Sequence, residues 1–290
     1  MDERIELVAV ASEQKVRLED FLQDRFRGLS KLYLRGLVKG EKCEVNGRYE
    51  NIGYRLRPND FIEIELDPTR ENAMLPQDIP LDIVHEDAEL IVVNKPIGML
   101  VHPSHRDKTG TLLNALVFHT NRNSSHSFIR PGLIHRLDKD TSGLIVAAKT
   151  PRAHRVLSSH FERKLVEKRY LALVDGNVAD DEGTITGAIG RYAEEKRWGL
   201  KDDGREAETR FWVRNRSAAA TLLELEPVTG RTNQLRIHCE TIGHPIVGDT
   251  LRGGSDFERL CLHAYRLAFR HPDGSGWVRF ESAPSFERAI

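Results

Sequence analysis

The stretch "PGLIHRLDKDTSGLIVAAKT", residues 131–150, holds the features that decide how this chain folds. Its apolar run "GLIVAA" is typical of a strand that is buried on both faces. Directly before this run stand four titratable or charged side chains: His135, Arg136, Asp138 and Asp140. A buried strand holds a loop still, so the arrangement predicts either a solvated charged loop or an active site with one essential carboxylate.

Further strand-like runs occur at "LIVVNKP", "RYLALVDG", "ETRFWVRN" and "TLLELEP". Helices are predicted at "GTLLNALVFHT", "TPRAHRVLSSHFERKLVEK" and "TNQLRIHCETIG". In the second helix Thr150 is the expected N-cap, Pro151 occupies the first helical position, and the apolar stripe consists of Val156, Leu157, Phe161 and Leu165. Strands outnumber helices and the two do not alternate regularly. The pattern therefore predicts an α+β fold with a largely antiparallel sheet.

The chain divides into a small module at residues 1–67, a polar linker with prolines at 68–80, and a larger domain at 81–290. In the module, a helix is predicted from Leu18 to Phe26, and a second helix follows the N-cap Ser30 and stops at Gly40. Asn46-Gly47 predicts a hairpin turn, and "DFIEIEL" alternates as a half-buried strand does.

Local charge suggests a partner for this module. Residues 15–48 contain nine Lys or Arg, Arg27 among them, against five Asp or Glu. Lys31, Arg35 and Lys39 recur every four residues, which places them on one helix face, and Lys42 and Arg48 follow in the hairpin. The row indicates either an ordinary solvated face or a surface that binds RNA phosphates.

Composition excludes several classes of protein. The 290 residues carry a formal net charge of −1 and no apolar run near the ~20 residues of a membrane span. No signal peptide is recognisable, and the three cysteines form no C-x-x-C pair, which favours a reduced, cytoplasmic compartment. Neither a Walker loop nor a Rossmann fingerprint is present. His102 and His105 are a weak metal candidate because Pro103 disfavours a helix between them.

The two carboxylates in the opening stretch, Asp138 and Asp140, are expected to have different roles. Asp138 and Asp140 could suggest a glycosidase pair, but such carboxylates usually come from separate elements. Asp140 is expected to bond the backbone of the turn, and Ser142 does not stand in a nucleophile elbow. Asp138 is therefore the candidate for chemistry.

Several blocks carry a family resemblance. "HRLDKDTSGLIVAAK" resembles the signature of the RluA-type pseudouridine synthases, and four more blocks follow the family's order: "VVNKPIGMLVHPS", "EKRYLALVDG", "PVTGRTNQLRIHCETIGHPIVGD" and "LCLHAYRLAF". The resemblance covers about residues 81–285. The N-terminal module resembles the alpha-L RNA-binding domain that often precedes this catalytic domain. The resemblance implies isomerisation of uridine to pseudouridine in RNA, without a cofactor or a metal.

The resemblance also implies roles for residues. Asp138 matches the essential aspartate, which acts on the ribose as a nucleophile or a base, and Arg236 matches the arginine that pairs with it. Tyr170 matches the tyrosine that stacks on the target base. Arg136 matches the arginine that fills the space of the flipped nucleotide. The remaining expected contacts to substrate or loop are Leu235, His135, Thr141, Arg231, Lys95 and Lys168.

The sequence departs from the family pattern at Asn233, where His is common, at Thr250 after "GD", and at Ser30-Lys31-Leu32 in the module. These departures affect fit to a target rather than the proposed chemistry. Large-subunit ribosomal RNA is the expected substrate of a monomeric, non-membrane enzyme. A tRNA substrate, a non-catalytic ribosome-assembly factor and a nucleoside glycosidase remain as alternatives.

Overall fold

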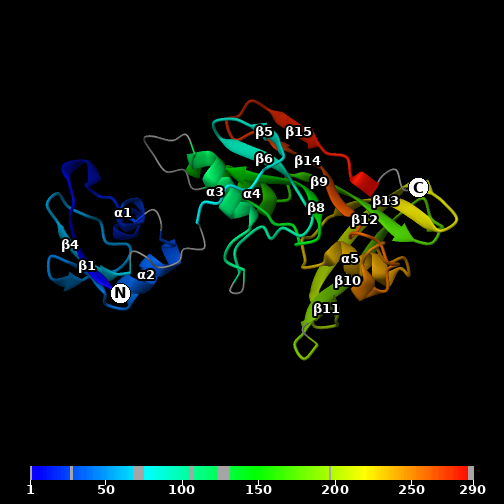
Figure 1. The fold of residues 1–290 in the computed structure, drawn as a ribbon, viewed down its shortest axis with the longest axis horizontal. Coiled ribbons are helices and arrows are strands. Elements are labelled where there is room, and N and C mark those ends of the chain that lie inside the picture. The colour runs from blue at the N-terminus through cyan, green and yellow to red at the C-terminus, as the bar shows by residue number, and fades with distance from the viewer. Residues whose placement is uncertain are drawn as a thin grey trace. The chain divides into compact units, whose positions relative to one another are not determined.

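The computed structural model describes residues 2–26, 29–67, 75–104, 107–122, 131–195 and 197–286. These residues form two compact units (Figure 1). The small unit comprises Met1–Ile79 and Pro103–Phe128, and the large unit comprises Pro80–His102 and Ile129–Ile290. The domain limits expected at residues 67 and 81 stay predictions.

The small unit is built on a four-stranded sheet in the order β1-β4-β2-β3, with antiparallel pairing throughout. Its core joins the buried face of β4, with Ile62 and Ile64, to Leu22 and Leu34 of two helices. Its elements are β1 Glu3–Val8, η1 Ala11–Glu13, α1 Leu18–Arg25, α2 Lys31–Lys39, β2 Cys43–Val45, β3 Arg48–Tyr49, β4 Phe61–Leu66 and α3 Leu112–Asn121.

Local sequence signals in the small unit are confirmed. The Ser30 hydroxyl accepts a hydrogen bond from the Tyr33 N–H at 3.2 Å, which caps α2 and contributes about 1 kcal/mol. Asn46 and Gly47 both have positive φ, 51° and 70°, as a type I′ turn between β2 and β3 requires. Strand β1 was not predicted.

The large unit contains an 11-stranded sheet whose main path is β11-β10-β12-β13-β9-β14-β8-β6-β5. Strand β7 pairs with β8, and β15 pairs with β14. Among the described pairings only β8 with β14 is parallel, so the predicted α+β fold with a largely antiparallel sheet is confirmed. The strands are β5 Ile83–Glu86, β6 Leu90–Lys95, β7 Gly132–Leu133, β8 Ser142–Ala148, β9 Glu167–Asp175, β10 Glu182–Tyr192, β11 Arg197–Leu200, β12 Arg205–Arg216, β13 Ala220–Pro227, β14 Leu262–Arg270 and β15 Trp277–Glu281.

Strand β8 is the buried strand that the opening stretch predicted, since every one of its residues is buried. Its start crosses β14 very closely. Gly143 has a φ of 116°, and a Cβ at this position would lie 2.4 Å from the carbonyl oxygen of Ala264. Only glycine fits both the backbone conformation and the space, which explains the glycine of the Thr-Ser-Gly sequence.

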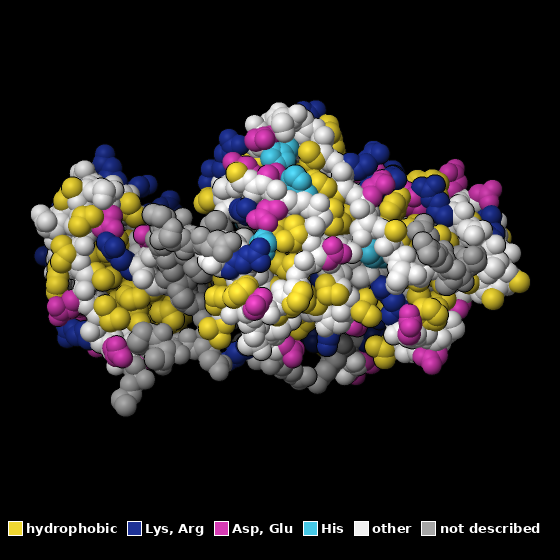
Figure 2. All heavy atoms as spheres, turned by 45° about the horizontal axis from the view of Figure 1, so that its top comes forward, with side chains coloured by type: hydrophobic (Ala, Val, Ile, Leu, Met, Phe, Trp, Pro, Cys, Tyr) yellow, Lys and Arg dark blue, Asp and Glu magenta, His cyan; other side chains and the backbone are white. Residues whose placement is uncertain are grey.

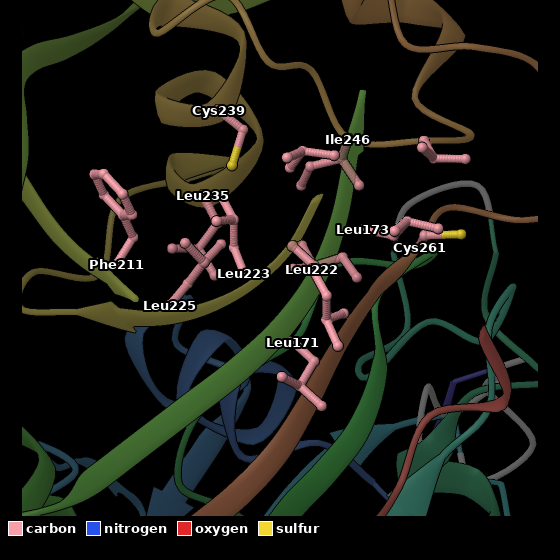
Figure 3. Close-up of a cluster of buried hydrophobic side chains, with 14 of the residues drawn as sticks. Leu171, Leu173, Phe211, Leu222, Leu223, Leu225, Leu235, Cys239, Ile246 and Cys261 are labelled. Carbon is pink, nitrogen blue, oxygen red and sulfur yellow. The ribbon is translucent and has the colours of Figure 1, made fainter. Parts of the chain in front are cut away.

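Helices α4 Pro151–Glu162 and α5 Gln234–Thr241 pack against different parts of this sheet (Figure 1). Leu157 of α4 packs with Leu144 and Val146 of β8. Figure 3 shows Leu235 and Cys239 of α5 pointing toward side chains of β13. Each fully buried leucine of this kind contributes about 1.5–3 kcal/mol. A short helix, η2 Thr250–Arg252, follows. All three cysteines are buried and free.

The structure corrects two expectations about the elements. The stripe of α4 does not extend to Leu165, because the helix ends at Glu162 and the Leu165 side chain is 47% exposed. The strands of the large unit that were not predicted are β5, β7, β10, β11, β14 and β15; in β10 three glycines weaken the strand pattern. No helix in the described ranges is long and apolar enough to cross a membrane.

Candidate active site

A pocket of about 330 Å³ lies between the loop before β8, strand β9 and the start of α5. It brings together nine residues that the sequence pointed to: His135, Arg136, Asp138, Thr141, Lys168, Tyr170, Arg231, Leu235 and Arg236. The other predicted contacts, Lys95 and the basic residues of the small unit, do not line it. The pocket therefore unites blocks that lie up to 127 positions apart, His135 and Leu262 being the extremes.

The loop that carries Asp138 is anchored on one side by His135. The N–H of Val146 in β8 donates to Nε2 of His135 at 3.2 Å, and the ring stacks on Phe161 with centroids 4.7 Å apart. Burial lowers the pKa of His135 to about 3, and the charge of Lys168 acts in the same direction. The imidazole is thus neutral at physiological pH, as its acceptor role requires, and it holds the loop rather than binding phosphate.

Lys95 anchors the same loop from below. Its side chain is 1% exposed, and its ammonium donates to the carbonyl oxygens of Pro96, Met99 and Lys139 at 2.7, 2.9 and 3.0 Å. An ammonium has three N–H donors, so none is left for RNA. Burial lowers the pKa of Lys95 to about 8, against the charges of Asp140 and Asp138. The expectation that Lys95 contacts the RNA backbone is corrected to a role inside the loop.

A third anchor is Ser142, at the first position of β8. The Nε2–H of His263 donates to the Ser282 carbonyl at 2.9 Å, so its Nδ1 is the acceptor for the Ser142 hydroxyl at 2.8 Å. The guanidinium of Arg259 donates to the same hydroxyl oxygen. Burial lowers the pKa of His263 to about 4, which keeps this ring neutral. Ser142 is therefore fully bonded in the core, where it fixes the end of the loop.

The turn itself differs from the expectation for Asp140. Thr141 N–H donates to the carbonyl of Asp138 at 3.2 Å, and Thr141 is buried. The Asp140 carboxylate is exposed and makes none of the described hydrogen bonds, so the predicted bond to the turn backbone is not formed. Its effect is electrostatic, through the charge of Lys95. Backbone and buried lysine, rather than Asp140, shape the turn.

Tyr170 faces Asp138 from strand β9. It lies in the sheet opposite Leu225 of β13 and Ala264 of β14, which fixes its backbone on both sides. Burial raises the pKa of the Tyr170 phenol well above its usual range, and the negative charge of Asp138 raises it further. The phenol is therefore protonated at neutral pH, so it can stack on a base or donate a proton, but it is not a resting base.

Arg236 has a different partner from the one expected. Its Nε and Nη2 donate to the two carboxylate oxygens of Asp249, both at 2.6 Å, and Asp249 is 3% exposed. Burial lowers the pKa of Arg236, but the hydrogen bonds and charge of Asp249 outweigh it and raise the pKa overall; Asp138 contributes less. No hydrogen bond or ion pair joins Arg236 to Asp138 in the described structure. The Asp138 carboxylate is thus free to face a substrate.

Sequence reasoning missed Asp249 and Gln234. Both stand in the quoted block "PVTGRTNQLRIHCETIGHPIVGD", where only the neighbouring positions drew attention. The Gln234 amide oxygen accepts from the Thr229 hydroxyl and the Arg231 N–H, and its nitrogen donates to the Glu208 carbonyl and the Thr209 hydroxyl. A buried amide with every bond made fixes the pocket wall that carries Arg231. Its role depends on these four hydrogen bonds, which the sequence alone does not show.

Asn233, which also lines the pocket, has an uncommon backbone conformation. Asn233 has a φ of 55°, a left-handed conformation that asparagine tolerates better than most residues. Its side chain accepts from Arg236 Nη1 at 3.5 Å, a long bond. The departure at this position therefore lies in the pocket, whereas Thr250 stands in η2 and is exposed.

The basic row of the small unit is partly neutralised. Arg35 pairs with Glu19 at 2.6 Å, Lys31 lies 3.3 Å from Asp20, and Lys42 pairs with Asp2 at 2.7 Å. Lys39 and Arg48 are exposed and make no such pair within the described residues. Arg27 lies outside the described residues. Figure 2 shows basic and acidic groups interspersed across its visible face. The predicted RNA surface of this unit is thus weaker than the bare row suggests.

The metal alternative receives no geometric support from the parts that can be described. His105 lies outside them, and within the described ranges no three His, Cys, Asp or Glu side chains gather as a metal site needs.

Comparisons with known proteins place this geometry in context. The family model for RNA pseudouridylate synthases matches residues 89–241. An uncharacterized RNA pseudouridine synthase of Bacillus subtilis is 36% identical, with 96% of this chain and 94% of the relative covered. The ribosomal large subunit pseudouridine synthase D of Pseudomonas aeruginosa is 35% identical, with 92% and 88% covered. The solved structure of human RNA pseudouridylate synthase domain containing 1 is 27% identical, with a TM-score of 0.62 over 73% of this chain and 87% of that chain.

Proposed function

Because this chain belongs to the RNA pseudouridylate synthase family, and is therefore an enzyme that isomerises uridine to pseudouridine in RNA, we propose that it acts on large-subunit ribosomal RNA. Several relatives that match most of the chain are named for that substrate. In this proposal the small unit, which resembles the alpha-L domain, supplies a second RNA contact. Lys39 and Arg48 make this contact directly, and Lys31, Arg35 and Lys42 add to it when RNA replaces their present carboxylate partners.

Asp138 is the proposed catalytic group. The observation that carries this assignment is its position in the pocket on a loop held by His135, Lys95 and Ser142, with Tyr170 opposite. A carboxylate held in this way can attack the ribose as a nucleophile or remove a ribose proton as a base. Either role requires that the Asp138 carboxylate is not held in a permanent ion pair. The pairing of Arg236 with Asp249 meets this requirement, because it keeps the guanidinium away from Asp138.

The neighbouring residues have complementary proposed roles. Tyr170 stacks on the uracil and, since its phenol is protonated, serves in proton transfer. Leu235 forms the apolar wall under the base. The exposed Arg136 fills the space left by the flipped nucleotide, and Arg231 and Lys168 contact the RNA backbone. Arg236 lends positive charge to the region of Asp138 without binding it.

The test compares two aspartates that stand two positions apart. The native protein, Asp138→Asn and Asp140→Asn are incubated separately with unmodified large-subunit rRNA transcript and with a tRNA pool, and pseudouridine is quantified. We expect product on rRNA from the native protein and from Asp140→Asn, and none from Asp138→Asn. Equal product from all three would remove Asp138 from the chemistry. Product on tRNA alone would overturn the substrate.

Two further readouts address the alternatives. Release of free uracil would indicate a glycosidase, and binding to rRNA without any product would indicate an assembly factor. Sedimentation of the native protein tests the proposed monomer, and cell fractionation tests the proposed cytoplasmic location.

A further inference from the structure

Helix α4 ends in a turn that normally calls for glycine. The N–H of Leu165 donates to the His160 carbonyl at 2.8 Å, and the N–H of Lys164 donates to the Phe161 carbonyl at 3.2 Å. These two bonds are those of a Schellman turn, in which the residue after the C-cap adopts the left-handed conformation. Lys164 occupies that position, with a φ of 58°.

A lysine is an unfavourable choice for this backbone. Glycine adopts the left-handed region without steric cost, and asparagine tolerates it, as Asn46 and Asn59 do elsewhere in this chain. A long side chain brings no benefit to the turn itself, because both hydrogen bonds are made by the backbone. Non-glycine residues in this conformation cluster at functional sites. Lys15 and Glu41 also adopt it away from the pocket, so for Lys164 the position of its turn beside the pocket carries the argument.

The turn borders the pocket. Phe161, whose carbonyl accepts from Lys164, lines the pocket, and so does Lys168, four residues after Lys164. Burial lowers the pKa of Lys168, and the positive charge of Lys164 lowers it further. Neither lysine forms an ion pair within the described residues; Glu226 acts on Lys168 only through its charge. Two positive charges therefore stand close together in sequence beside the pocket, Lys168 in its lining and Lys164 in the turn bonded to Phe161.

We propose that Lys164 and Lys168 together form a subsite for a phosphodiester of the substrate RNA next to the target nucleotide. The proposal rests on the proposed function, since it assumes that the pocket receives an RNA nucleotide. A phosphate between two ammonium groups removes their repulsion and forms charge-assisted hydrogen bonds. Lys168 lines the pocket, and Lys164 stands in the turn bonded to the pocket-lining Phe161, so the phosphate would lie beside the pocket on the side of this turn.

The substitution Lys164→Gly should affect stability and RNA binding in opposite directions. Lys164→Gly removes the charge and supplies the residue that the turn prefers. We expect it to keep or raise the melting temperature while it weakens binding to a labelled large-subunit rRNA transcript by about 3–10-fold at 0.1 M salt. The slope of log affinity against log salt should fall in magnitude by about 0.7–0.9, the value for one lost phosphate contact.

Three variants control this result. Lys164→Asn removes the charge with a residue that tolerates the backbone, and it should weaken binding as Lys164→Gly does. Lys164→Arg keeps the charge and should retain native affinity. Lys15→Gly, at a lysine with a φ of 67°, reports the effect of the backbone alone on the melting temperature.

Two outcomes would overturn the proposal: unchanged affinity and salt slope in Lys164→Gly and Lys164→Asn, or an equal loss of affinity in Lys164→Arg. Pseudouridine formation by the native protein is measured on the same RNA. Product from the native protein together with either of those outcomes leaves the proposed function standing and removes only the subsite.

Discussion

The ion pair between Arg236 and Asp249 yields a prediction that distinguishes two pairings of Arg236, with Asp249 or with Asp138. Both Nε and Nη2 of Arg236 lie 2.6 Å from Asp249, and the Asp249 carboxylate is 3% exposed. Removing one charge of a buried pair costs about 3–5 kcal/mol because the other charge stays buried. The Arg236 side chain is 15% exposed, so water relieves part of that cost. We expect Asp249→Asn to lower the free energy of unfolding by about 3 kcal/mol.

Asp138→Asn is the matched control, since it makes the same chemical change at another aspartate whose charge acts on Arg236. Asp138 has no ion pair with Arg236 in the described structure, so its substitution should change stability by no more than about 0.5 kcal/mol. Urea unfolding of both variants, each with and without Arg236→Gln, gives two double-mutant cycles. The cycle with Asp249 should show strong coupling and the cycle with Asp138 almost none. Equal losses from the two aspartate substitutions would refute the pairing seen here.

Three further predictions concern the loop and the sheet. Ser142→Ala should lower kcat for pseudouridine formation at least about tenfold, because the end of the Asp138 loop loses its anchor. Gly143→Ala should cost at least about 3 kcal/mol in urea unfolding, since its Cβ would meet the Ala264 carbonyl. Burial lowers the pKa of His271, but hydrogen bonds to Asp273 and Asp87 outweigh this effect and raise the pKa overall. The stability that His271 contributes is therefore present below about pH 6.5, the usual pKa of histidine, and is lost as the pH rises through the folded-state pKa. His271→Gln should therefore destabilise the protein more at pH 6 than at pH 9.

The substitutions at Ser142 and Gly143 each have a control in the chain. Ser217→Ala removes a hydroxyl that bonds only within its own turn and should leave kcat unchanged. Gly98 has a φ of 73° with nothing within 4 Å of an added Cβ, so Gly98→Ala should cost only about 1–2 kcal/mol. Native kcat in Ser142→Ala, equal losses at the two glycines, or a pH-independent effect at His271 would contradict the respective argument.

Local signals were sufficient for much of the fold. The cap at Ser30, the turn at Asn46-Gly47 and the buried strand β8 were predicted because each depends on residues that are neighbours in sequence. Strand β10 could not be found in this way, because the reason for its glycines lies in other strands: an added Cβ at Gly183 or Gly187 would meet the side chain of Phe211 or Leu200.

The candidate site shows the same division. Resemblance placed Asp138, Tyr170 and Arg236 in one pocket, and the structure brings them together. It did not reveal that Lys95 is buried beneath the loop, because a lysine in a sequence carries no record of its solvent exposure. Nor did it reveal the partner of Arg236, since the choice between Asp138 and Asp249 depends on how α5 lies against the following loop.

The contact between β8 and β14 also bears on when the enzyme becomes active during synthesis. Ser142 and His263 are 121 positions apart, and Gly143 lies against Ala264 in the sheet's parallel pairing. A chain emerging from the ribosome displays the Asp138 loop long before β14 has been made. Until that strand arrives, the loop lacks one of its anchors, and a fragment that ends before residue 262 contains the whole signature without the support that aims it. The loop therefore reaches its final support only when β14 has been made and has paired with β8.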